Sequence, residues 1–233
     1  MRTRKWLSLI CGIALVLPVV ACSRMDPSKT TQHTETCEVE IVYKRNQICY
    51  AISNQEENHS LYTFNAAGLP VMEQDGKKGT ASSLKPGMCV SVTYDGYLLE
   101  TYPAQFSGVT EVKVDQVKAN NVDFFTKQIS SMFPSTSPSD LKHWNISFQG
   151  VPVLRENEKL ALKHILSENW NNTSITIDSS ESDPEETAQI LIRIDEYTTS
   201  TMTFEITVNA GNEESPTSRD FNVTLSDGTW NMN

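Results

Sequence analysis

The side chains that could form a catalytic or metal centre are scattered along this 233-residue chain. The histidines show no His-x-x-x-His spacing and no Cys-x-x-Cys pair occurs, so the sequence predicts no metal site. No Gly-x-Ser-x-Gly nucleophile motif is present. Two carboxylates could still hydrolyse a glycosidic bond, and Asp95 with Glu100, on either side of a predicted hairpin, form a candidate pair. The dipeptide Asp95-Gly96 is a strong turn signal, however, which favours a structural role for Asp95.

The densest group of acidic side chains falls in one predicted loop. It consists of Asp178, Glu181, Asp183, Glu185 and Glu186. Carboxylate oxygens suit calcium, but the loop lacks the glycine turn of an EF-hand and is interrupted by a proline. Because runs of like charge are usually solvated, we expect an exposed loop here and no metal site.

The start of the chain is typical of an export signal. Three basic residues precede an apolar run, residues 6–20, which is shorter than the ~20 residues that a membrane-spanning helix needs. Small and apolar residues then stand in front of a cysteine, in the order Val19-Val20-Ala21-Cys22. These features predict a signal peptide over residues 1–21.

The stretch Val19-Val20-Ala21-Cys22 resembles the lipobox of bacterial lipoproteins. In that family the cysteine thiol receives a diacylglyceryl group, and cleavage leaves the cysteine as the new N-terminus. The resemblance implies that Cys22 is lipidated and holds the protein on the extracytoplasmic face of the cell membrane. A second fatty chain on its amine would make the anchor stable, because one acyl chain alone binds membranes only marginally. A membrane-spanning leader and plain secretion are the alternatives.

The charge of the chain limits its partners. The sequence has 19 basic and 29 acidic residues, a net charge of −10, and loss of residues 1–21 would make the balance more negative. Such a chain is repelled by nucleic acid and by anionic lipid headgroups, so we expect neither as a partner.

Residues 37–118 are predicted to form a small β-barrel, because apolar residues alternate with polar ones over five or six short stretches separated by turns. The first two stretches would form a hairpin about Arg45-Asn46, with Tyr43 opposite Ile48 and one buried face. Residues 22–36 show no apolar periodicity and are predicted to be a flexible tether.

Three cysteines remain outside the leader and the anchor. They are Cys37, Cys49 and Cys89, so at most one disulfide could form within the chain. The predicted hairpin register places Cys37 and Cys49 opposite other residues, which argues against a bridge between them. Three free thiols are the expectation, and a bridge to Cys89 is left open.

Part of this region resembles a family of small OB-like barrel domains without known function, which recur in secreted and lipid-anchored proteins of Gram-positive bacteria. The resemblance is carried by Lys85-Pro86-Gly87, by residues 90–96 and by Glu100-Thr101-Tyr102-Pro103-Ala104-Gln105. The Tyr-Pro-Ala turn is its most specific part. The resemblance implies a barrel and an extracytoplasmic location, and it brings no catalytic residues.

Thr101, Tyr102 and Pro103 form a candidate ligand lip, because OB barrels bind oligonucleotides and sugars through one face and its loops. The acidity of the chain argues against nucleic acid as the ligand. The alternative is a structural turn in which Pro103 fixes the backbone and Tyr102 packs over the mouth of the barrel.

Residues 144–233 are predicted to form an α+β domain, joined to the barrel by a connecting helix and linker over residues 119–143. One helix, residues 156–168, carries an apolar stripe at helical spacing. Strands with one buried face each are predicted at 174–178, 189–197, 201–209 and 219–225. One helix on an antiparallel meander is therefore expected. Trp144, Trp170 and Trp230 could form an exposed aromatic platform or close the core.

Taken together, these patterns predict a β-rich α+β protein without a catalytic centre, cofactor or metal. Its expected role is that of a lipid-anchored, non-catalytic binding or scaffolding module for an envelope protein or a cell-wall ligand. The alternative is an extracytoplasmic, carboxylate-dependent hydrolase. A binding module should expose an apolar or aromatic patch. An enzyme should instead show a pocket with convergent carboxylates of perturbed pKa.

Overall fold

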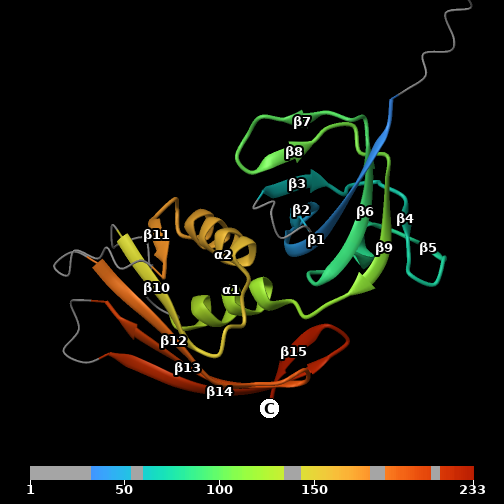
Figure 1. The fold of residues 1–233 in the computed structure, drawn as a ribbon. Helices are drawn as coiled ribbons and strands as arrows, with labels where there is room; N and C mark the ends of the chain where they lie inside the picture. Colours follow the sequence, from blue (N-terminus) through green and yellow to red (C-terminus); the bar gives the residue numbers. More distant parts are fainter. Residues whose placement is uncertain (1–32, 54–59, 134–142, 179–186, 211–215) are drawn as a thin grey trace, which may run out of the picture. The chain divides into compact units, whose positions relative to one another are not determined.

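Alternating apolar and polar residues build two β-sheets, and two α-helices lie between them (Figure 1). The structure is a computed structural model, and it describes residues 33–53, 60–133, 143–178, 187–210 and 216–233. The fold is of the β-rich α+β class that the sequence predicts. Residues 33–233 cluster as one compact unit, and the predicted boundary between two domains within it stays a prediction.

The first sheet curls into a half-barrel. Its strands are β1 (Glu35–Arg45), β2 (Ile48–Ser53), β3 (Leu61–Asn65), β4 (Val71–Met72), β5 (Lys78–Gly79), β6 (Met88–Tyr94), β7 (Leu98–Leu99), β8 (Ala104–Phe106) and β9 (Glu111–Val117). Their order across the sheet is β5-β4-β9-β6-β1-β2-β3-β8-β7, which places β7 at an edge. β1 begins within the segment predicted to be a tether, because its first residue, Glu35, still pairs with Tyr94 at the end of β6.

The β1–β2 hairpin does not have the predicted register. Tyr43 pairs with Tyr50 and not with Ile48, and the turn begins at Asn46. Asn46 has a φ of 56°, a left-handed conformation that asparagine tolerates and that tight hairpin turns require. The register also shifts just after Ile41, where a β-bulge adds one residue to β1.

The hairpin buries both of its faces, because alternate side chains enter two different cores. Ile41 and Cys49 lie in the core of the half-barrel. Val42, Tyr50 and Ile52 instead lie in a second core, together with the helices and the second sheet. The prediction of a single buried face is therefore wrong, because each face of the hairpin packs on its own core. The bulge adds to this in β1, where it changes which residues face each core after Ile41.

The second sheet is mixed. Its strands are β10 (His143–Gly150), β11 (Ser174–Ile177), β12 (Thr187–Tyr197), β13 (Thr201–Asn209), β14 (Thr217–Ser226) and β15 (Thr229–Met232), in the order β11-β10-β12-β13-β14-β15. β10 runs parallel to both β11 and β12, so the sheet is not the pure antiparallel meander that was expected. A parallel neighbour requires a long crossover, and the helix after β10 supplies it.

Two helices, and not one, cover this sheet. They are α1 (Asn121–Ser131) and α2 (Glu156–Asn169). α1 falls in the segment predicted to connect the domains, and it packs against α2 and β1. Phe125 of α1 and the predicted apolar stripe of α2, including Leu162 and Ile165, are fully buried in the second core.

The three tryptophans help to close this second core. Trp144, Trp170 and Trp230 are all buried, which excludes the exposed aromatic platform. The rings of Trp144 and Trp170 lie 5.7 Å apart. Trp230 Nε1 donates a hydrogen bond of 2.9 Å to Asn121 Oδ1, which satisfies the polar end of the indole inside the core.

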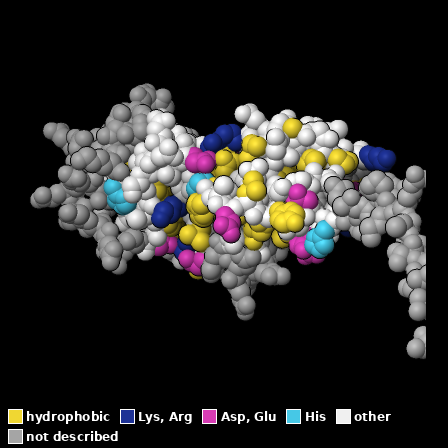
Figure 2. Space-filling model, turned by 90° about the horizontal axis from the view of Figure 1, so that it is seen from above, with side chains coloured by type: hydrophobic (Ala, Val, Ile, Leu, Met, Phe, Trp, Pro, Cys, Tyr) yellow, Lys and Arg dark blue, Asp and Glu magenta, His cyan; other side chains and the backbone are white. Residues whose placement is uncertain are grey.

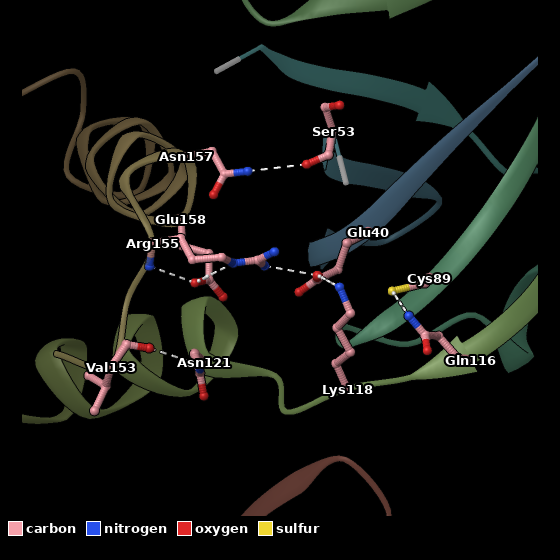
Figure 3. A network of polar contacts seen from close by, with 10 residues as sticks. All are labelled: Glu40, Ser53, Cys89, Gln116, Lys118, Asn121, Val153, Arg155, Asn157 and Glu158. Carbon is pink, nitrogen blue, oxygen red and sulfur yellow. Dashed lines mark hydrogen bonds and ion pairs between the residues drawn. The ribbon is translucent and has the colours of Figure 1, made fainter. Parts of the chain in front are cut away.

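A buried ionic network ties the half-barrel to the start of α2 (Figure 3). Glu40 of β1 is only 2% exposed, and its Oε2 accepts hydrogen bonds from Arg155 Nη2 (2.9 Å) and Lys118 Nζ (3.1 Å). Arg155 also bonds Glu158 through its backbone N–H and its Nε. Asn157 adds a bond from α2 to the backbone of β2, at Ser53 O.

Candidate functional site

The predicted lip, residues 101–103, forms a tight turn between β7 and β8. Thr101 N donates a hydrogen bond to Leu99 O (2.8 Å), and Thr101 Oγ1 donates one to Pro103 O (2.7 Å). The peptide bond between Tyr102 and Pro103 is cis. Within this turn Tyr102 is 67% exposed, so it does not pack over the mouth of the half-barrel as the structural alternative proposed.

Tyr102 instead lies beside α2. Its ring stands perpendicular to that of His164, with the two centroids 5.2 Å apart. His164 Nε2 lies 3.0 Å from Glu168 Oε1, close enough for an ion pair when the ring is protonated. The two atoms are not oriented for a hydrogen bond. The other oxygen of Glu168 accepts a hydrogen bond from Tyr50 (2.8 Å) and pairs with Arg45 (3.3 Å).

A cavity of about 650 Å³ opens between the lip, α2 and β11. Its walls include Tyr102 from the lip, His164 and Ser167 from α2, Asn172 from the following turn and Thr176 from β11. A second cavity, of about 340 Å³, continues along α2 and β11 and shares wall residues with the first. The sequence predicted only the lip. Nothing in the spacing of residues indicated that α2 and β11 would meet it, because the contact is tertiary.

The hairpin that carries the lip also exposes large apolar side chains. Tyr97, Leu98 and Leu99 are 71%, 42% and 46% exposed. We call these three residues the flap. Leu98 and Leu99 form β7, which has a neighbour on one side only among the described strands. Figure 2, seen from above and hence from the side of β7 and β8, shows hydrophobic side chains gathered on this face with acidic ones among them.

The candidate pair of catalytic carboxylates does not converge on a pocket. Asp95 accepts hydrogen bonds from Tyr97 N (3.1 Å) and Ser107 Oγ (2.9 Å), the bonds of a turn residue. Glu100 is exposed, and neither it nor Asp95 lines the cavities described above.

Among the described residues, the carboxyl groups with a shifted pKa are shifted downward. The hydrogen bonds of Lys77 lower the pKa of Asp75. Burial acts to raise the pKa of Asp115, but bonds from Ser91 and Lys113 outweigh it and lower that pKa. A general acid working near neutral pH needs a raised pKa instead. Within the same residues, no cluster of three or more His, Cys, Asp or Glu could hold a metal ion.

The described cysteines, Cys37, Cys49 and Cys89, form no disulfide. Cys37 lies opposite Val92 on β6, and Cys49 lies opposite Lys44. Burial raises the pKa of the Cys49 thiol to about 11 and also raises the pKa values of Cys37 and Cys89. These thiols are therefore poor nucleophiles at neutral pH.

Two predicted features lie wholly or partly outside the described residues. Cys22 is one of them, and so is the acidic loop except for Asp178. Asp178 accepts a hydrogen bond from Phe148 N (2.7 Å) and pairs with Lys159 (2.7 Å), which gives it a structural role.

These features define a β-rich α+β protein with an exposed apolar flap and a polar cavity beside an aromatic lip. No protein-family model matches the chain, and no curated protein matches it significantly. Neither helix in the described part of the chain is long and apolar enough to cross a membrane.

Proposed function

We propose that this chain is a lipid-anchored protein of the cell envelope that acts as a non-catalytic binding module. In this proposal Cys22 carries the lipid, and the folded body binds a partner protein outside the cytoplasm. The lipobox resemblance supports the anchor, and the family resemblance of the Tyr-Pro-Ala segment supports the location.

The exposed flap is the observation that carries the binding role. Large apolar side chains rarely gather on the surface of a protein that has no partner. Tyr97, Leu98 and Leu99 are consecutive, and two of them form the edge strand of the half-barrel. Their burial against a partner would remove apolar surface from water, at roughly 25 cal/mol for each Å².

The surroundings of the flap define the chemistry of its partner. Glu35, Asp95 and Glu100 border the flap, and the whole chain is acidic. A partner with an apolar centre and a rim of Lys or Arg complements this surface. Such charge complementarity mainly accelerates association, so binding should weaken as salt is added.

A pull-down of the intact anchored protein from its own membranes tests the binding role. The double variant Leu98→Ser/Leu99→Ser should lose the partner that the wild-type protein retains. Met232→Ser is a matched control, because Met232 is 54% exposed but lies on β15. A partner held equally by all three proteins would show that the flap is not the binding surface.

Mass spectrometry of the mature N-terminus tests the anchor. The proposal expects a lipidated Cys22 as the first residue, and Cys22→Ala should release the protein from membranes. An unmodified N-terminus at any other residue contradicts lipid anchoring and leaves the binding role to be judged by the pull-down.

A further inference from the structure

The cavity beside the lip is a second candidate binding site, separate from the flap. Its volume of about 650 Å³ falls within the ~300–1,000 Å³ that is usual for small-molecule sites. It is walled by elements far apart in the sequence, namely the lip, α2 and β11. The contact between Tyr102 and His164 fixes the distance between the lip and α2.

The walls of this cavity are about as polar as they are apolar, and they carry little charge. The hydroxyl groups of Ser167 and Thr176 donate to Thr173 O and Asn145 Oδ1, so their oxygens can serve a ligand as acceptors. The exposed amide of Asn172 can both donate and accept. Among the described residues that line it, Lys163 is the one permanent cation, and none is acidic. These walls therefore favour a neutral ligand that forms hydrogen bonds over a charged one.

The direction of α2 also argues against an anion. Ser167 lies in the last turn of the helix, and Asn172 follows shortly after its end. The C-terminal end of a helix carries a partial negative charge from its carbonyl groups. Phosphate and carboxylate groups are therefore disfavoured beside these residues, in spite of Lys163.

The exposed Tyr102 supplies the aromatic part of the site, beside the apolar side chains of Leu160 and Ile175. Tyr102 is 67% exposed, so much of its surface is available to a ligand. A sugar ring has hydroxyl groups around its edge and C–H groups on its faces. It can therefore pack one face on an aromatic ring while its edge exchanges hydrogen bonds with a polar wall.

We propose that the cavity between Tyr102 and the C-terminal half of α2 binds a neutral saccharide. The ring of Tyr102 packs against one sugar face, and Ser167, Asn172 and Thr176 exchange hydrogen bonds with the sugar hydroxyls. This site needs neither the lipid anchor nor the flap. It would make the protein a wall-binding module as well as a protein-binding one.

Titration of the full chain with the N-acetylglucosamine trimer and with cellotriose, followed by calorimetry and by saturation-transfer NMR, tests this proposal. At least one of these neutral probes should bind. Tyr102→Ala should weaken that binding by about tenfold, while Tyr102→Phe retains it, because the ring face is the contact. The resonances of His164 should shift on binding, since its ring touches that of Tyr102.

The controls separate this site from the flap and from an anion site. Tyr97→Ala removes an equally exposed aromatic residue of the same hairpin and should leave saccharide binding unchanged. Inorganic phosphate should not displace the sugar. The proposal is overturned if neither saccharide binds, if Tyr102→Ala binds as well as the wild type, or if phosphate competes. Because Tyr102 is exposed, its substitution should not unfold the protein.

Discussion

Glu40 of β1 and Arg155, the residue before α2, are joined by a hydrogen-bonded ion pair of 2.9 Å across 115 positions of sequence. Burial acts to lower the pKa of Arg155, but the bonds and charges of Glu158 and Glu40 outweigh it and raise that pKa. The arginine is therefore held in its charged form between two carboxylates (Figure 3). This contact fixes the half-barrel against the helices that carry the cavity.

Loss of the buried carboxylate should be costly. We expect Glu40→Ala to lower the free energy of unfolding by about 3 kcal/mol, because it removes the buried carboxylate that accepts hydrogen bonds from both Arg155 and Lys118. The value lies at the low end for such a change, since Glu158 still pairs with Arg155. Urea unfolding measures it. Asp75→Ala, which breaks the exposed Asp75–Lys77 pair, should leave stability almost unchanged. Equal effects of the two substitutions would contradict a role for burial.

The β1–β2 hairpin contributes side chains to both hydrophobic cores, so the described unit should unfold cooperatively. Ile52→Ala removes a side chain that is buried among the helices and the second sheet, although Ile52 belongs to the first sheet. We expect a loss of about 2–5 kcal/mol and a single thermal transition at lower temperature. Leu160→Ala, on the exposed side of α2, should have a much smaller effect. Two separate transitions in calorimetry would show that the sheets unfold independently.

Tyr50 should make stability depend on pH in the alkaline range. Burial, followed by its hydrogen bond to Glu168, raises the pKa of Tyr50 from 10.0 to about 12. The pKa is higher in the folded state, so the contribution of Tyr50 is complete below pH 10 and is lost as the pH rises toward 12. Denaturant midpoints measured between pH 8 and 12 should fall above pH 10. Tyr50→Phe should reduce that fall, whereas Tyr97→Phe, on the exposed flap, should not.

The thiols should react in an order set by burial. Cys37 is partly exposed, whereas Cys49 is fully buried and has a pKa of about 11. Because the thiolate is the reactive form, iodoacetamide at pH 8 should modify Cys37 first and Cys49 last in the folded protein. Peptide mass spectrometry measures the rates. In urea the two rates should converge, and equal rates in the folded protein would contradict the buried position of Cys49.

The sequence predicted those strands and helices whose apolar residues follow one regular spacing. The alternation of residues 201–209 predicted β13 with the bounds that the structure has, and the apolar stripe of α2 predicted that helix to within one residue of its end. The alternating stretches also predicted the β-rich α+β class. These predictions hold because a side chain's face in a strand or helix follows from its spacing alone.

The tertiary structure decided which surfaces meet. The bulge after Ile41 and the left-handed turn at Asn46 shifted the register of the first hairpin. The sequence did not predict this shift, because neither feature changes the apolar pattern. The parallel pairing of β10 with β11 depends on the crossover through α2, which the alternation of the strands alone does not indicate. Tyr102 was predicted as part of a lip from its turn, but its partner His164 lies 62 residues further along the chain, where packing alone brings it into contact.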